Sequence, residues 1–279
     1  MVGTEKIKEL LQFCECNYLA QKDCRLQCKN CIECFCTRFS CMDCVNSIYN
    51  YNRVIDNSKR KFCNNRALCY VKNNLTKYCS ELLSLMTAIK GRKGKIENAS
   101  LGCGPATELY AIDYYIANHF PEKNVQVDYK GFDIDIDWKV IQDKNIELFQ
   151  KDSNINVAFL HEDMFEYYRK NGNTPDFIIM NYMLSDMALF FNDRIKKFLD
   201  ELCSFINNAP KEIWVLVNDT NLLYFYRKNE ILFASDCFKY ISEKLSNANI
   251  KIGYLYFSYP DKYNLPPKTW YKLSFPKLG

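Results

Sequence analysis

From Lys95 onward, short apolar runs alternate with longer stretches that have helical periodicity. Each of the following apolar runs has the length of one β-strand, and helical stretches separate them: residues 95–102, 125–132, 156–160, 176–180 and 212–218. Strands that alternate with helices predict a parallel sheet covered by helices on both faces. Two later runs, 251–260 and 269–276, have no helical stretch between them and predict an antiparallel hairpin at the sheet edge.

The first predicted strand ends in a glycine-containing turn, Leu101-Gly102-Cys103-Gly104-Pro105-Ala106, which leads directly into a helical stretch. Glycines at such a turn let a ligand approach the backbone at the N-terminus of the helix. The dinucleotide-binding pattern G-x-G-x-x-G has its third glycine where this chain has Thr107, which argues against a pyrophosphate ligand. A ligand without a phosphate needs only the close approach to the backbone.

The stretch 100–109, SLGCGPATEL, resembles the first motif of class I S-adenosylmethionine-dependent methyltransferases, and residues 60–279 follow that family's element order. The resemblance implies an α/β fold with a Rossmann-like seven-stranded sheet, parallel except for an antiparallel terminal hairpin. It also implies S-adenosylmethionine as the cofactor. The chain departs from the family's pattern at Ser100, where an acidic residue is common, and at Ala106, where a third glycine is usual.

The same resemblance implies roles for residues that follow the predicted strands. Asp133 corresponds to the acid that the family places on the ribose hydroxyls, and a carboxylate can accept two hydrogen bonds from a diol. Asp163 and the backbone amide of Met164 correspond to adenine contacts. Glu108 is expected near the amino-acid end of the cofactor, although an acid there also favours the helix dipole. The predicted cofactor-binding residues are Leu101, Gly102, Cys103, Gly104, Glu108, Asp133, Ile134, Asp163, Met164 and Asn181.

The residues after the fourth predicted strand are the candidates for the methyl-acceptor site and for catalysis: Asn181, Tyr182 and Asp186. The N/D-P-P-Y/F motif of enzymes that methylate exocyclic base amines is absent, as are the Pro-Cys nucleophile of cytosine-C5 enzymes and the paired glutamates of arginine methyltransferases. A nucleic-acid acceptor modified at another atom is nevertheless the first hypothesis, because of the basic, cysteine-rich N-terminal segment described below. A protein or small-molecule acceptor is the second, and a non-catalytic S-adenosylmethionine-binding assembly module is the third.

The cysteines are concentrated near the N-terminus, where nine of the fifteen lie within 31 residues. Repeated C-x2-C steps there have the spacing that places two thiolates on one zinc ion. The predicted ligands of two or three zinc ions are Cys14, Cys16, Cys24, Cys28, Cys31, Cys34, Cys36, Cys41 and Cys44. The segment is loosely similar to cysteine-rich CXC-type domains, which bind zinc and DNA. The alternatives are an iron–sulfur site, whose spacing Cys24-x3-Cys28-x2-Cys31 matches, and redox-active or unliganded thiols.

Charge is also unevenly distributed along the chain. Residues 1–95 contain 17 Lys+Arg and 8 Asp+Glu, a net charge of +9, whereas residues 96–279 contain 20 and 25, a net charge of −5. Basic residues beside aromatic ones, as in Lys59-Arg60-Lys61 near Tyr49 and Tyr51, suit phosphate contact and base stacking. Nucleic acid is therefore the expected partner, with a protein as the alternative. A purely structural zinc module with solvated lysines remains the other interpretation.

These observations divide the chain into three segments: a cysteine-rich zinc-binding module in residues 1–50, a connector with a helix packed on the catalytic domain in 51–94, and a methyltransferase domain in 95–279. No apolar run approaches the roughly 18 residues that a membrane helix requires. The N-terminal residues carry charges where a signal peptide would be apolar. We therefore expect a soluble, cytoplasmic protein without membrane contact, and the sequence does not indicate its oligomeric state.

Overall fold

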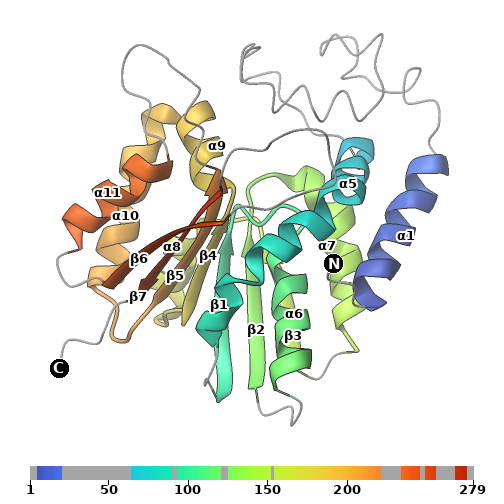
Figure 1. Ribbon diagram of the computed structural model, residues 1–279, viewed down its shortest axis with the longest axis horizontal. Coiled ribbons are helices and arrows are strands. Elements are labelled where there is room, and N and C mark those ends of the chain that lie inside the picture. Colours follow the sequence, from blue (N-terminus) through green and yellow to red (C-terminus); the bar gives the residue numbers. More distant parts are fainter. Residues whose placement is uncertain are drawn as a thin grey trace.

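The computed structural model describes residues 5–20, 64–89, 93–120, 125–151, 154–220, 234–245, 249–255 and 268–274. Its strands are β1 (Gly94–Leu101), β2 (Val125–Phe132), β3 (Ile155–Leu160), β4 (Phe177–Asn181), β5 (Trp214–Thr220), β6 (Asn249–Leu255) and β7 (Lys268–Ser274). They form one sheet in the order β3-β2-β1-β4-β5-β7-β6 (Figure 1). Strands β1 to β5 are mutually parallel, while β7 runs antiparallel to β5 and β6. The predicted α/β Rossmann-like fold with a parallel sheet is confirmed.

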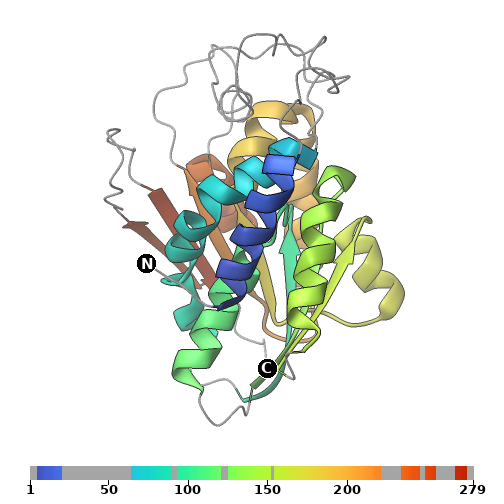
Figure 2. The same cartoon turned by 90° about the vertical axis from the view of Figure 1, so that its right-hand side faces the viewer.

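Helices cover both faces of the sheet (Figures 1 and 2). The described helices are α1 (Glu5–Ala20), α5 (Asn64–Leu82), α6 (Thr107–His119), α7 (Lys139–Phe149), α8 (Met164–Asn171), α9 (Met183–Phe190), α10 (Asn192–Asn207) and α11 (Ala234–Lys244), with the short 3-10 helices η4 (Leu85–Ile89) and η5 (Ile136–Trp138). One hydrophobic cluster joins α1, α5, α6 and α7 to the sheet, and a second joins α8 to α11 to the opposite face. This two-sided burial is what a parallel sheet requires.

One predicted helix is divided in two. The sequence predicts a single amphipathic helix over residues 187–207, but α9 ends at Phe190 and α10 begins at Asn192. Between them, Phe191 has φ −134° and ψ 41°, which is not helical. Its carbonyl oxygen accepts the first backbone hydrogen bonds of α10, from Arg194 and Ile195. The apolar periodicity continues across Phe191, so it gave no sign of the break.

The N-terminal helix α1 corrects the predicted start of the cysteine block. The sequence predicts a short helix over residues 1–13 with the cysteine block after it, whereas α1 continues through Cys14 and Cys16 to Ala20. Cys14 is fully buried in the same cluster as Ile7 and Leu10, and burial raises the pKa of its thiol to about 12. Cys16 is exposed. Residues two apart on a helix point about 200° apart, so these two thiols cannot bind one ion together.

The burial of Cys14 therefore argues against it as a zinc ligand, and Cys16, exposed on α1, could not share an ion with it. The other seven predicted ligands, Cys24 to Cys44, lie outside the described residues, and so does the basic stretch 59–61. Within the described ranges, no group of three or more His, Cys, Asp or Glu side chains could hold a metal ion. Among the same residues, no helix has both the length and the apolar character needed to cross a membrane.

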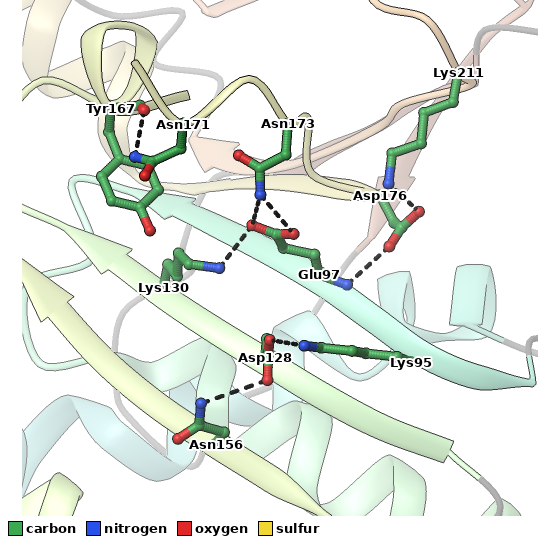
Figure 3. Close-up of polar contacts among 10 residues, drawn as sticks. All are labelled: Lys95, Glu97, Asp128, Lys130, Asn156, Tyr167, Asn171, Asn173, Asp176 and Lys211. Atoms are coloured by element: carbon green, nitrogen blue, oxygen red, sulfur yellow. Dashed lines mark hydrogen bonds and ion pairs between the residues drawn. The ribbon is translucent and has the colours of Figure 1, made fainter. Parts of the chain in front are cut away.

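A polar cluster joins the strands toward their N-terminal ends (Figure 3). The Glu97 carboxylate on β1 accepts hydrogen bonds from Lys130 Nζ on β2 at 2.6 Å and from Asn173 Nδ2 at 3.2 Å. Asp176, just before β4, accepts from the Glu97 backbone N–H at 2.8 Å and from Lys211 Nζ at 2.7 Å. These contacts fix the relative positions of β1, β2, β4 and β5 at the end of the sheet opposite the glycine-containing turn.

Gly131 on β2 is expected to tolerate no side chain. A Cβ atom built there would lie 2.8 Å from Cys103 Sγ and 2.8 Å from Phe159 Cδ1, closer than packed atoms approach. We expect Gly131→Ala to lower the free energy of unfolding by about 1–3 kcal/mol, the usual cost of overpacking, as measured by urea denaturation. Gly172→Ala is a comparison that has backbone strain without a clash, because φ there is +66° and a Cβ meets nothing within 4 Å. A Gly131→Ala protein as stable as the wild type would contradict this packing.

Candidate active site

The turn after β1 has an unusual backbone. Gly102, Gly104 and Ala106 have φ of +56°, +48° and +58°, in the left-handed region. A Cβ at Gly102 would lie 3.2 Å from Met183 Cγ, and one at Gly104 would lie 3.4 Å from the Trp138 ring. The two glycines therefore allow close approach as well as the turn itself, and Ala106 holds a conformation that strains a residue with a side chain. Such strain is frequent at functional sites.

Asp133 joins this turn to the end of β2. Its Oδ2 accepts a hydrogen bond from the Gly104 backbone N–H at 2.7 Å, and its Oδ1 accepts one from the Asp135 backbone N–H at 2.8 Å. Burial raises the pKa of Asp133, while the two backbone N–H groups oppose the rise. A carboxylate has about four lone-pair positions, so Asp133 can still accept hydrogen bonds from a ligand. The structure thus brings together Asp133 and the glycine turn, as the sequence analysis expected.

The segment after Asp133 exposes apolar side chains. Ile134 is 81% exposed and Ile136 is 64% exposed, the most exposed large hydrophobic side chains among the described residues. His161, after β3, has its Nδ1 2.9 Å from the Asp133 carbonyl oxygen, which ties the ends of β2 and β3 together. Ile134, which follows Asp133 in the sequence, therefore offers an exposed apolar side chain.

Three predicted cofactor residues, Asp163, Met164 and Cys103, have side chains that the protein itself engages or buries. Asp163 is exposed, and its Oδ1 accepts a hydrogen bond from the Glu166 backbone N–H at 2.9 Å, so it acts as the N-cap of α8. The Met164 and Cys103 side chains are both buried. Burial raises the pKa of the Cys103 thiol well above its ordinary value. The Met164 and Cys103 side chains are therefore not available to a ligand, and the Cys103 backbone N–H donates to the Phe132 carbonyl oxygen at 3.2 Å.

Glu108 is directed into the protein rather than toward solvent. It is almost fully buried, and its Oε1 accepts hydrogen bonds from Ser100 Oγ and Tyr129 Oη, each at 2.5 Å. Burial raises the pKa of Glu108, and these hydroxyl donors oppose the rise. Ser100 is the position at which the sequence lacks the family's usual acid. The Glu108 carboxylate accepts the Ser100 hydroxyl, so an acid from α6 lies next to position 100.

A chain of buried polar side chains leads from Glu108 across the sheet. Its members are Glu108, Thr107, Asn181, Asn218 and Glu81. Thr107 Oγ1 lies 3.4 Å from Glu108 Oε2 and accepts from Asn181 Nδ2 at 2.9 Å. Asn218 Nδ2 donates to Asn181 Oδ1 at 2.8 Å and to Glu81 Oε2 at 3.1 Å. Asn181, predicted to contact both cofactor and acceptor, is the middle of this chain.

Sequence reasoning missed Glu81, Thr107 and Asn218. Asn218 had a usable signal, because it is the polar residue that ends the apolar run of β5, at the same edge as the other site residues. Glu81 had none, since it belongs to α5 and to the predicted connector. Only the packing of α5 against α6 brings it to the sheet.

Tyr182 is the single residue between β4 and α9. It has φ +58°, and its backbone N–H donates to the Asn218 carbonyl oxygen at 2.7 Å. Its hydroxyl donates to Glu81 Oε2 at 2.7 Å, and its ring centroid lies 4.5 Å from that of Tyr78. Asp186, half-buried on α9, lies close enough to Tyr78 for its charge to raise the Tyr78 pKa, though burial of the phenol is the largest cause. The three predicted acceptor residues thus lie at the C-terminal end of β4 and the start of α9.

Comparison with known proteins supports the fold. No family profile and no curated protein matches this chain. Among solved structures, one from Listeria monocytogenes, described as a class I S-adenosylmethionine-dependent methyltransferase, has a TM-score of 0.51 and 13% identity, covering 99% of this chain and 90% of its own. A cyclopropane-fatty-acyl-phospholipid synthase-like protein from Lactobacillus casei has a TM-score of 0.48 and 9% identity, covering 74% and 93%. At such identities the likeness shows the class I methyltransferase fold alone.

Glu108 is expected to make stability depend on pH. Because its pKa in the folded protein is raised above the ordinary 4.5, the folded state binds this proton more tightly than the unfolded state. Stability from Glu108 is therefore greatest at low pH and is lost as pH rises through the folded pKa. Glu108→Gln has no proton to lose and can still accept the Ser100 and Tyr129 hydroxyls. We expect the stability of the variant relative to wild type to increase with pH above 4.5, as measured by urea denaturation.

The control for this experiment is Glu147→Gln, an exposed glutamate paired with Lys144. Asp133 also titrates in wild type and in both variants, so the difference between Glu108→Gln and wild type isolates Glu108. Parallel pH profiles for wild type and Glu108→Gln would show that burial does not perturb this carboxyl group.

Proposed function

We propose that the protein is an S-adenosylmethionine-dependent methyltransferase. The observation that supports this most strongly is the Gly104–Asp133 contact. It places a carboxylate beside a left-handed glycine turn, on a sheet of the class I methyltransferase fold. A cofactor without a phosphate fits this turn because the turn offers close approach and an acid rather than an anion-binding site. Ile134, which follows Asp133 in the sequence, supplies an exposed apolar side chain.

In this proposal, Asp133 accepts hydrogen bonds from the ribose hydroxyls, and the backbone at Gly102 to Gly104 admits the rest of the cofactor. S-Adenosylmethionine supplies a methyl carbon that its sulfonium makes susceptible to nucleophilic attack. The protein's contribution is to orient the acceptor and to exclude water. Asn181 ends β4, and Tyr182 and Asp186 follow it beside the glycine turn that Met183 contacts; these three residues would line the acceptor side.

For the acceptor, we propose a nucleic acid that the basic N-terminal segment engages, with zinc held by the remaining cysteines Cys24 to Cys44. The supporting observations are the net charge of +9 over residues 1–95 and the repeated C-x2-C spacing. The described residues at the C-terminal edge of the sheet do not provide this affinity, because acids such as Asp133, Asp135 and Asp163 predominate there. Phosphate contacts would therefore come from the N-terminal segment, and the acceptor group alone would enter the site.

Asp133→Asn tests the cofactor site. Both carboxylate oxygens accept a backbone N–H, and an asparagine would direct its NH₂ group at one of these donors. Hydrogen bonds to a charged group contribute about 1.5–3 kcal/mol, so we expect S-adenosylhomocysteine to bind about 10- to 100-fold more weakly by calorimetry. Asp143→Asn, an exposed residue paired with Lys139, should bind like wild type. Equal affinity of Asp133→Asn and wild type would falsify the assignment.

Salt and metal dependence test the nucleic-acid proposal. We expect binding to RNA or duplex DNA to weaken steeply with salt, with log K falling by about 0.7–0.9 per phosphate contact for each unit of log salt. Removal of zinc with a chelator should abolish this binding but leave S-adenosylhomocysteine binding intact, because Asp133 and the glycine turn lie in the sheet domain. The proposal is rejected if binding is insensitive to salt, or if metal analysis finds less than one zinc per chain.

A further inference from the structure

Glu81 is a buried acid from outside the predicted methyltransferase domain. It lies on α5 with an exposure of 0%, and one oxygen, Oε2, accepts both the Tyr182 hydroxyl at 2.7 Å and Asn218 Nδ2 at 3.1 Å. Both donors are neutral side chains. Taking a carboxylate out of water is costly, whereas an amide in the same place would accept the same two hydrogen bonds at lower cost. These two hydrogen bonds alone would therefore not require an acid at position 81.

The partner of Glu81 lies where the acceptor is expected. Tyr182 immediately follows β4, is half-buried, and precedes Met183, the residue that contacts the glycine turn. Its left-handed backbone is held by the hydrogen bond to the Asn218 carbonyl, and its ring packs against Tyr78. Backbone, ring and hydroxyl are thus each fixed by a separate contact. A phenol held this rigidly, with its proton directed at a carboxylate, has the geometry of a proton relay.

We propose that Glu81 is the final proton acceptor, through Tyr182, for a methyl transfer to a hydroxyl group; this rests on the proposed function. As the acceptor oxygen bonds to the methyl carbon, the carbon–sulfur bond breaks and its electron pair stays on sulfur. The hydroxyl proton passes to Tyr182 Oη, whose own proton passes to Glu81 Oε2. A neutral amine attacks through its lone pair and can lose its proton afterwards, so it needs no such relay. A hydroxyl is a weak nucleophile until its proton leaves.

Other titratable groups surround this pair, and they must be separated from Glu81 in any pH experiment. Among the described residues, Tyr78 lies next to Glu81 on the same helix, and Asp186 on α9 faces Tyr78. Lys77 Nζ lies 5.4 Å from the centre of the Tyr78 ring. The strand packed against Glu81 contributes the neutral Asn218. Because all of these remain when Glu81 alone is replaced, the comparison of Glu81→Gln with wild type isolates the one carboxyl group.

The experiment measures transfer of radiolabelled methyl groups from S-adenosylmethionine into the cell-lysate fraction that wild type labels, as a function of pH. Glu81→Gln keeps an oxygen that accepts the Tyr182 and Asn218 donors but cannot take a proton. Tyr182→Phe keeps the ring on Tyr78 and removes the hydroxyl. The matched control is Glu97→Gln, the same change in the polar cluster at the opposite end of the sheet (Figure 3). Calorimetry with S-adenosylhomocysteine checks that each variant retains its cofactor site.

We expect Glu81→Gln and Tyr182→Phe each to lower the labelling rate about 100-fold or more, the usual contribution of a general base. The double variant should be no slower than either single variant, since both remove the same relay. Any acid limb of the wild-type pH–rate profile should be missing in Glu81→Gln. S-Adenosylhomocysteine should bind all variants equally, and mass spectrometry should find the new methyl group on oxygen.

Several results would overturn the relay while the methyltransferase proposal stands. These are a Glu81→Gln protein that labels at the wild-type rate, one that is slow but keeps the acid limb of the pH profile, or a methyl group found on nitrogen or carbon. If wild type binds S-adenosylhomocysteine but labels no fraction, the proposed activity fails and the relay fails with it.

Discussion

The hydrogen bond between the Gly104 N–H and the Asp133 carboxylate organises the ends of the first two strands. β1 and β2 pair in parallel with Leu101 opposite Phe132, so the segments that follow them emerge side by side. The segment after β1 contains three left-handed residues within five positions, a conformation that must be held by its surroundings. Asp133 holds it from the next strand, and Trp138 packs against Gly104 from η5. The site therefore depends on the register of β1 and β2 and on the Asp133 carboxylate, which accepts the Gly104 N–H at a fixed position.

The chain of polar side chains from Glu108 to Glu81 connects the glycine turn to Tyr182, one of the proposed acceptor residues. Buried polar groups stabilise a structure only when their hydrogen bonds are made, and a fully connected network then restricts the conformations around it. Here the chain of polar side chains passes through α6, β4 and β5 to Glu81 on α5, which accepts the Tyr182 hydroxyl. Helix α5 comes from the segment that the sequence marks as a connector. Through Glu81 it nevertheless takes part in the same site as the glycine turn.

Features set by local sequence were predictable, and those set by distant contacts were not. Alternating apolar and helical runs predicted the strands, and the resemblance to class I methyltransferases assigned Asp133 to the same cofactor site as Gly104. The Glu81 contacts join residues 101 and 137 positions apart, so no local pattern could indicate them. Cys14 misled for the opposite reason. A C-x-C spacing has the same appearance in a metal-binding loop and in a helix, and only the packing of α1 on α5 shows that Cys14 belongs to the hydrophobic core.

The direction of the hydrogen bonds gives the two buried acids separate roles. Asn218 Nδ2 donates to Glu81 on one side and to Asn181 on the other, and Asn181 Nδ2 donates onward to Thr107, beside Glu108. The donors therefore point outward from the middle of the chain toward both carboxylates. An amide N–H does not give up its proton near neutral pH, so Asn181 and Asn218 join the two acids mechanically without letting a proton pass between them. A proton taken up by Glu81 would remain on the acceptor side, while the protonation of Glu108 beneath the glycine turn would stay unchanged.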